Sequence, residues 1–248
     1  SGDSHDTDDS CLDVRGNKNL IENLKIDNCL FGIDLKQSSD NIVRGNTVRS
    51  KDLDLGVRGD GLRLWYSNNN LIEKNEIIDS RDMVAWYAHR NTFRENLGRR
   101  SRYSIHFMFA NDNIVERNQF YDNAVGVYFM YTEGGIARNN IISHATGATG
   151  MGIGFKEASG TLIENNEIIY CGVGIGSDLS PFQPDSTIEV RGNRFAYNGI
   201  GIMFNSETGG NNMVDNIFEG NLTQVSYGGH GDNNNNEKNF WQGNFWDD

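Results

Sequence analysis

A short motif, apolar–x–x–Asn–x–apolar, recurs through nearly the whole chain and limits its fold more than any other feature. Two clear copies are Val43…Asn46…Val48 and Ile163…Asn166…Ile168. The asparagine position falls at Leu24, where leucine replaces asparagine, and then at Asn46, Asn75, Asn96, Asn118, Asn139, Asn166, Asn193, Asn216 and Asn244. Many of the intervals lie near 22 residues, and the longer ones fit the same unit with a loop added. The pattern predicts a stack of similar coils.

The apolar residues within each unit predict strands rather than helices. They form short runs that alternate with period two and are broken by Gly and Asn, whereas helical repeats need a spacing of 3.6. A leucine-rich consensus is also missing. Units of about 22 residues with two or three short strands are typical of a right-handed parallel β-helix. We therefore predict an all-β fold, a single right-handed parallel β-helix of about ten coils over residues 1–248, with a short polar loop at 229–238.

The repeated asparagine is expected to serve two purposes. Asparagine tolerates left-handed backbone geometry at a turn. Its amide can also hydrogen-bond to the asparagine of the next coil, so that the stacked residues form a ladder.

Charge and composition exclude several classes of protein. The formal net charge of −12 argues against a nucleic-acid partner, because phosphate binding needs a basic face. No stretch approaches the roughly 20 apolar residues of a transmembrane helix, and residues 1–5 carry no signal-peptide pattern. The odd cysteine count without tight spacing predicts buried thiols rather than a disulfide framework or a zinc motif at Cys11, Cys29 and Cys171.

Aligning the strand that precedes each repeated asparagine separates an inner from an outer face. The aligned segments are 62–67, 83–88, 105–110, 127–132 and 153–158. Alternation predicts that the inward side chains are Leu62, Leu64, Ala85, Ile105, Phe107, Val127, Phe129, Ile153 and Phe155. One outward column is then Arg63, Val84, His106, Tyr128 and Gly154, and the second is Trp65, Trp86, Met108, Met130 and Lys156. Large apolar side chains in an outward row indicate a binding function or a covering element.

Three residues of these columns form a candidate metal site. Met108 and Met130 are expected at the same register in adjacent coils, with Cα atoms about 5 Å apart. His106 precedes Met108 by two residues and shares its face. Two thioethers and an imidazole suit Cu(I) rather than zinc or calcium, and Trp86 could shield the ion with its ring. The alternative is that these side chains pack beneath a loop or form a protein interface.

A carbohydrate function is the second hypothesis. Outward Trp65, Tyr66, Trp86 and Tyr87 could stack on sugar rings. Cleavage would need paired carboxylates or a basic residue beside acidic groups. The candidate substrate-binding residues are Arg63, Trp65, Trp86, Lys156, Glu157 and Asp178, with Asp60 and Asp82 as further carboxylates. The segment Gly229-His230-Gly231 resembles a polygalacturonase motif, but the acidic clusters that accompany it there are not at matching places.

Four segments of the chain resemble the NosD family, periplasmic β-helix proteins of nitrous oxide reductase maturation. Residues 104–112 (Ser-Ile-His-Phe-Met-Phe-Ala-Asn-Asp) are similar to the most characteristic coil of that family, and 127–132 (Val-Tyr-Phe-Met-Tyr-Thr) resemble its next coil. Further similar segments are 223–227 (Thr-Gln-Val-Ser-Tyr) and 243–248 (Gly-Asn-Phe-Trp-Asp-Asp). The resemblance covers most of the chain from about Phe31, as coil repeats of the carbohydrate-binding and sugar-hydrolase type.

The resemblance implies an accessory role rather than an enzymatic one. It implies a periplasmic or extracellular protein, not itself spanning the membrane, that assists copper delivery to a copper enzyme. Its expected partners are an ABC transporter and a copper chaperone or copper-enzyme client, and its expected ligand is transiently bound copper. Only His106, Met108 and Met130 carry over, because they lie where the characteristic coils match. Trp65-Tyr66 and Trp86-Tyr87 depart from the family pattern, which leaves the client enzyme open.

Overall fold

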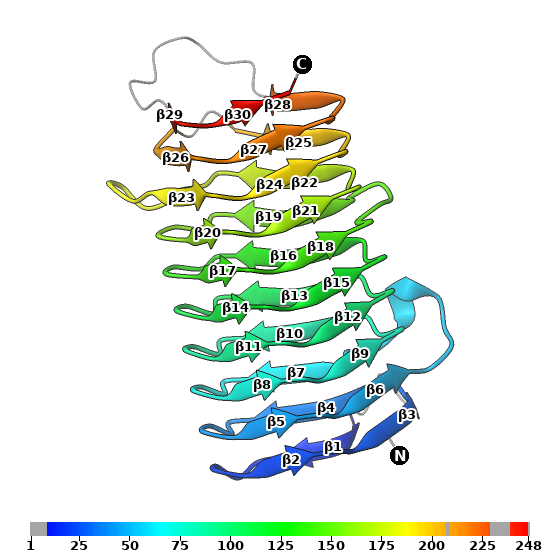
Figure 1. Cartoon of the computed structure of the whole chain (residues 1–248). Helices are drawn as coiled ribbons and strands as arrows, with labels where there is room; N and C mark the ends of the chain where they lie inside the picture. The colour runs from blue at the N-terminus through cyan, green and yellow to red at the C-terminus, as the bar shows by residue number, and fades with distance from the viewer. Residues whose placement is uncertain (1–8, 207–208, 229–238, 248) are drawn as a thin grey trace.

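The computed structural model describes residues 9–206, 209–228 and 239–247, and within them the chain winds into a right-handed parallel β-helix (Figure 1). Three parallel sheets run along the stack, each with ten strands, and every third strand of the sequence joins the same sheet. The predicted fold is therefore confirmed. The predicted loop at 229–238 lies outside the described residues.

The first sheet, called sheet A below, contains β1 (Ser10–Val14), β4 (Phe31–Lys36), β7 (Leu62–Trp65), β10 (Asp82–Trp86), β13 (Tyr103–Met108), β16 (Val125–Met130), β19 (Met151–Lys156), β22 (Val173–Asp178), β25 (Ile200–Phe204) and β28 (Thr223–Tyr227). Sheet B contains β2 (Leu20–Glu22), β5 (Ile42–Arg44), β8 (Leu71–Glu73), β11 (Thr92–Arg94), β14 (Ile114–Glu116), β17 (Ile136–Arg138), β20 (Leu162–Glu164), β23 (Ile188–Arg191), β26 (Asn211–Val214) and β29 (Phe240–Gln242).

Sheet C contains β3 (Lys25–Cys29), β6 (Thr47–Ser50), β9 (Glu76–Ile78), β12 (Leu97–Arg99), β15 (Gln119–Tyr121), β18 (Ile141–Ser143), β21 (Glu167–Ile169), β24 (Arg194–Ala196), β27 (Ile217–Glu219) and β30 (Phe245–Trp246). A 3₁₀ turn, η1 (Leu55–Val57), lies in the long connection between β6 and β7 (Figure 1). The described residues contain no helix that could span a lipid bilayer.

The core is a column of side chains enclosed by the three sheets. All nine predicted inward residues of sheet A are at most 2% exposed. Phenylalanines at equivalent positions stack from coil to coil, with centroid distances of 5.2 Å for Phe107–Phe129 and 5.7 Å for Phe129–Phe155. The period-two alternation in the sequence is thus confirmed as the boundary between core and outer face.

The predicted asparagine ladder exists between sheets B and C, with one correction. The Nδ2 of Asn96 donates to the Oδ1 of Asn118 at 3.0 Å. The next ladder residue is Asn140 and not the predicted Asn139, because Asn118 donates to Asn140 at 3.0 Å and Asn140 to Asn166 at 2.9 Å. Asn139 lies one residue earlier, at φ 55°.

The two roles predicted for one asparagine are divided between neighbouring residues. The ladder residue donates and accepts through its amide, and the residue before it adopts the left-handed conformation. These left-handed positions are Asn23, Gly45, Lys74, Glu95, Arg117, Asn139, Asn165, Gly192, Asp215 and Gly243. The sequence pattern could not separate the roles at 139–140, because both residues there are asparagine.

A second asparagine ladder, which the motif did not reveal, lies between sheets A and B. Its amides are linked from Nδ2 to Oδ1 at 2.8–3.1 Å through Asn19, Asn41, Asn70, Asn91 and Asn113. Four of the five are buried, and each amide hydrogen-bonds to its neighbour in the ladder, which avoids the cost of burying an unpaired polar group.

The cysteine prediction is wrong for two of the three residues. Cys11 of β1 and Cys29 at the end of β3 form a disulfide, whereas Cys171 is a buried free thiol as predicted. The linear spacing of 18 residues gave no signal, because the coil brings its own first and third strands together. Closing a loop of this size contributes about 3 kcal/mol in the chain-entropy account. The disulfide ties the first coil to itself.

Candidate functional site

The strand pairing of sheet A confirms the register of both predicted columns, although Val84 and His106 of the first column are buried rather than exposed. Trp86 pairs with Met108, Met108 with Met130, and Met130 with Lys156. In the neighbouring column His106 pairs with Tyr128. His106, Met108 and Met130 therefore lie on the same face of the adjacent strands β13 and β16, and Met108 and Met130 are direct partners in the strand register.

His106 is more enclosed than an outward column suggests, since only 8% of the residue is exposed. The rings of Tyr103 and Tyr128 lie against it, at centroid distances of 4.9 and 6.0 Å. Its Nδ1 is 3.8 Å from a carboxylate oxygen of Asp82. Its Nε2 is buried without a hydrogen-bond partner among the described residues, and so is the Nε1 of Trp86 on the same face. An unmet buried polar atom costs about 1–3 kcal/mol, so these two nitrogens are candidate ligand contacts.

A row of buried carboxylates supports this face. Asp34, Asp60 and Asp82 are each at most 3% exposed. Each one faces an arginine from a neighbouring coil: Asp34 pairs with Arg63, Asp60 with Arg81, and Asp82 with Arg102. The Asp60–Arg81 pair is bidentate, with both nitrogen–oxygen distances at 3.0 Å. Of the three pairs, Asp82–Arg102 is the one beside His106.

The environments of two of these carboxyl groups move their pKa values in opposite directions. Burial raises the pKa of Asp60 to about 6, helped by the charge of nearby Asp82 and opposed by Arg81. Burial also acts to raise the pKa of Asp82, but His106 and Arg102 outweigh it, and the pKa of Asp82 is lowered. The carboxyl group beside His106 is therefore anionic at neutral pH.

A third column, one residue past the ends of the sheet A strands, is aromatic. It is a row of four stacked rings, Tyr66, Tyr87, Phe109 and Tyr131, with centroids 4.8–5.1 Å apart. All four residues have left-handed backbones, with φ between 48° and 55°. This conformation costs a bulky L-residue about 1 kcal/mol or more. The row is thus a strained feature that the sequence analysis recognised only in part, through the two tyrosines.

The residues of the carbohydrate hypothesis are divided along the stack. They are Arg63, Trp65, Trp86, Lys156, Glu157 and Asp178. The two tryptophans pack edge to face at 4.8 Å, but Met108 and Met130 separate them from Lys156 in the same column. Lys156 pairs with Asp178 in the next coil. Glu157 lines a pocket described below, together with residues that the sequence analysis did not single out.

The donor set fits a soft monovalent ion better than a hard divalent one. Within the described ranges, no group of three or more His, Cys, Asp and Glu residues is arranged to hold a metal ion. Imidazole nitrogen and thioether sulfur, which His106, Met108 and Met130 carry on this face, are donors of the kinds that Cu(I) accepts.

A family model described as "Periplasmic copper-binding protein (NosD)" matches residues 49–248. The match includes the strands that carry His106, Met108 and Met130. No curated protein matches the chain.

Three solved structures with the same fold are of two enzymes named for a polysaccharide and of a tailspike protein in complex with a pentasaccharide. The A-module of mannuronan C-5 epimerase AlgE6 from Azotobacter vinelandii has a TM-score of 0.61 at 16% identity, over 92% of this chain and 64% of that one. A mutant tailspike protein of E. coli bacteriophage HK620, in complex with a pentasaccharide, has a TM-score of 0.60 at 12% identity, over 96% of this chain and 55% of that one. Endopolygalacturonase I from Stereum purpureum, complexed with galacturonate, has a TM-score of 0.56 at 13% identity, over 95% of this chain and 71% of that one. This chain spans less than two thirds of the first two, and identities this low show the fold alone.

Proposed function

We propose, on the premise that this chain belongs to the NosD family of periplasmic copper-binding proteins, that it takes up Cu(I) on the outer face of sheet A and delivers it to a copper enzyme during assembly. One observation carries the proposal. Within the described part of the chain, the buried Nε2 of His106 has no hydrogen-bond partner, and it lies on the face where Met108 and Met130 are partners in the strand register. The family match makes copper the ion to test first.

The chemistry of the three side chains favours uptake of a soft ion. Thioethers are polarizable neutral donors, and imidazole coordinates through its neutral form. Asp82 lies on the Nδ1 side of the ring and favours a proton there, which leaves the Nε2 lone pair for the ion. The anionic carboxylate also offsets the positive charge that the ion would bring into a partly buried site.

The same donor set suits transfer rather than permanent storage. The two thioethers carry no proton that an ion must displace, so loading and release of Cu(I) at the sulfurs need no proton movement. We propose an ABC transporter and a copper chaperone or copper-enzyme client as partners in this transfer. The Cys11–Cys29 disulfide supports a periplasmic or extracellular location, because disulfides persist in oxidising compartments.

The test is an anaerobic titration of the protein with Cu(I) in competition with a chromophoric chelator. We expect one Cu(I) per chain. The variant Met108→Leu/Met130→Leu removes both sulfurs with little change in volume, and it should weaken binding at least about tenfold. X-ray absorption of the loaded protein should show sulfur and nitrogen neighbours in the wild type and lose the sulfur contribution in the variant.

Two matched controls separate this site from other soft donors. Met203 is partly buried on β25 of the same sheet, so Met203→Leu should leave the Cu(I) affinity unchanged. Cys171→Ala tests the buried free thiol. A wild type that binds no Cu(I), or a double variant that binds as tightly as the wild type, rules the proposed site out.

A further inference from the structure

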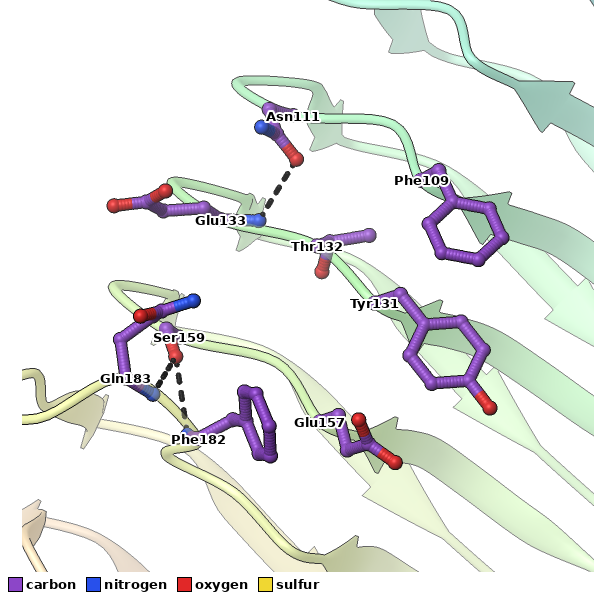
Figure 2. Close-up of a pocket in the computed structure, with 9 residues that line it drawn as sticks. All are labelled: Phe109, Asn111, Tyr131, Thr132, Glu133, Glu157, Ser159, Phe182 and Gln183. Carbon is purple, nitrogen blue, oxygen red and sulfur yellow. Dashed lines mark hydrogen bonds between the residues drawn. The ribbon is translucent and has the colours of Figure 1, made fainter.

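A pocket of about 320 Å³ lies where the strands β13, β16 and β19 end (Figure 2). Its walls are Phe109, Asn111, Tyr131, Thr132, Glu133, Glu157, Ser159, Phe182 and Gln183, and none of them belongs to the copper site proposed above. The volume is at the lower end of the range for small-molecule pockets, about 300–1,000 Å³.

Thr132 provides the observation that points to a ligand. The residue is only 3% exposed, lines the pocket, and its Oγ1 is buried without a hydrogen-bond partner among the described residues. Figure 2 shows this hydroxyl on the side of the pocket that faces Ser159 and Phe182. A buried hydroxyl without a partner is unfavourable in the free protein, so a ligand with a hydrogen-bonding group would remove a penalty on binding.

Hydrogen bonds within the protein hold the walls of the pocket in place. The backbone nitrogens of Phe182 and Gln183 both donate to the Oγ of Ser159, at 3.0 and 2.8 Å, and hold the loop after β22 against the strand ends. On the opposite side, the Oδ1 of Asn111 accepts from the backbone nitrogen of Glu133 at 3.0 Å. All three hydrogen bonds are drawn in Figure 2. A pre-formed pocket reduces the ordering cost of binding.

Two kinds of surface meet in the pocket. Phe109 and Tyr131 end the row of stacked rings, because the next residue in that column is Glu157, and Phe182 adds a third ring from its loop. The other lining residues carry carboxylates, amides and hydroxyls, among them the hydroxyl of Thr132. None of the nine lining residues is Lys or Arg, and Glu133 and Glu157 make the pocket acidic.

We propose that this pocket binds a neutral carbohydrate. A pyranose ring presents C–H groups on one face, which can pack against an aromatic ring, and hydroxyl groups around its rim. Each hydroxyl both donates and accepts, which matches a wall made of amides, carboxylates and one unpaired hydroxyl. An acidic sugar would bring its carboxylate against Glu133 and Glu157 with no lining cation to neutralise it. The pocket therefore selects against uronates.

The binding test uses the copper-free full chain and defined tetrasaccharides. Cellotetraose, maltotetraose and tetra-N-acetylchitotetraose are the neutral probes, tetragalacturonate is the acidic probe, and choline is the probe for an organic cation. Saturation-transfer NMR and calorimetry measure binding. We expect at least one neutral probe to bind, with tetragalacturonate at least tenfold weaker.

Two variants place the binding in this pocket. Phe182→Ala removes the exposed ring from the loop, and Thr132→Val removes the unpaired hydroxyl, so each should weaken binding severalfold. Tyr170→Ala is the matched control, because Tyr170 is a similarly exposed aromatic residue outside the pocket lining. Circular dichroism and thermal unfolding verify that each variant is folded.

Four results would overturn the proposal: no binding of any neutral probe, binding that both variants leave unchanged, tetragalacturonate as the tightest probe, or choline as the only ligand. Cu(I) binding is measured separately on the same preparations, so failure of this proposal and failure of the copper proposal are distinguishable.

Discussion

The Nδ1 of His106 lies 3.8 Å from a carboxylate oxygen of Asp82, and the Nε2 of the same ring is buried without a hydrogen-bond partner among the described residues. The distance is too long for a hydrogen bond, so the carboxylate acts on the ring mainly through its charge. The Nδ1 side of the imidazole thus faces an anionic carboxylate, and the Nε2 side is the one on which we propose that Cu(I) binds.

Changing Asp82 should therefore weaken Cu(I) binding without removing any ligand. The Asp82→Asn variant loses the negative charge behind the imidazole, and we expect a loss of Cu(I) affinity of about tenfold. The chelator competition described above measures it. Asp79→Asn is the matched control, because Asp79 is also paired with an arginine, Arg100, but lies at the end of β9 in sheet C. Equal effects of the two variants would contradict a specific role for Asp82.

The corrected asparagine ladder predicts unequal costs at two adjacent positions. Asn140 is buried and bonds through its side chain to Asn118, Asn166 and the carbonyl of Val115, so Asn140→Ala should destabilise the fold by about 3 kcal/mol. Asn139→Gly should change the free energy of unfolding by less than about 1 kcal/mol, since glycine accepts the left-handed backbone there. Urea unfolding measures both values, and similar losses would show that the ladder is assigned wrongly.

Asp60 predicts a dependence of stability on pH. Its pKa is raised to about 6 in the folded state, from 3.8 for an unperturbed carboxyl group. The folded state therefore binds this proton more tightly, and its contribution to stability is present below pH 4 and is lost as the pH rises towards 6.

The Asp60→Asn variant lacks this titration. Between pH 4 and pH 6, the free energy of unfolding of the wild type should fall relative to that of the variant, by up to about 3 kcal/mol. The pKa of Asp82 is lowered, so the contribution of Asp82 to the free energy of unfolding changes below pH 4, outside this range. Parallel pH profiles of the two proteins in urea unfolding would refute the assignment.

Thr132 predicts that a substitution in the pocket stabilises the free protein. Valine keeps the shape of the side chain but removes the unpaired hydroxyl, so Thr132→Val should raise the free energy of unfolding by about 1 kcal/mol. Thr161→Val is the control. The Oγ1 of Thr161 donates to the carbonyl of Ser159 at 3.2 Å, so its loss should destabilise the fold. If Thr132→Val also destabilised the protein, the hydroxyl would have a partner within the fold.

The fold followed from the sequence because its two signals are local. Alternation within a strand and recurrence of asparagine about every 22 residues are visible in the linear chain. The structure contains both, as the alternate burial of strand residues and as the repeating coil. The pairing of Met108 with Met130 followed from the same alignment. The choice between Asn139 and Asn140 did not, since the motif tolerates either residue and only the hydrogen bonds distinguish them.

The missed features depend on contacts between different parts of the coil. The Cys11–Cys29 disulfide joins the first and third strands of one coil, and a repeat period says nothing about such a closure. The pocket needs Phe182, which reaches it from the irregular loop after β22 that no repeat describes. The enclosure of His106 by Tyr103 was also missed, because Tyr103 precedes the aligned segment.

Each of the two methionine strands ends where the pocket begins. Met108 is followed directly by Phe109, and Met130 by Tyr131, so the last residue of each strand belongs to the proposed copper site and the next residue lines the pocket. The same short pieces of backbone therefore set the spacing of the sulfurs and the spacing of the pocket walls. We therefore expect that Cu(I) bound at the methionines changes the affinity of the pocket for its ligand, and that a ligand in the pocket changes the affinity for Cu(I) by the same factor.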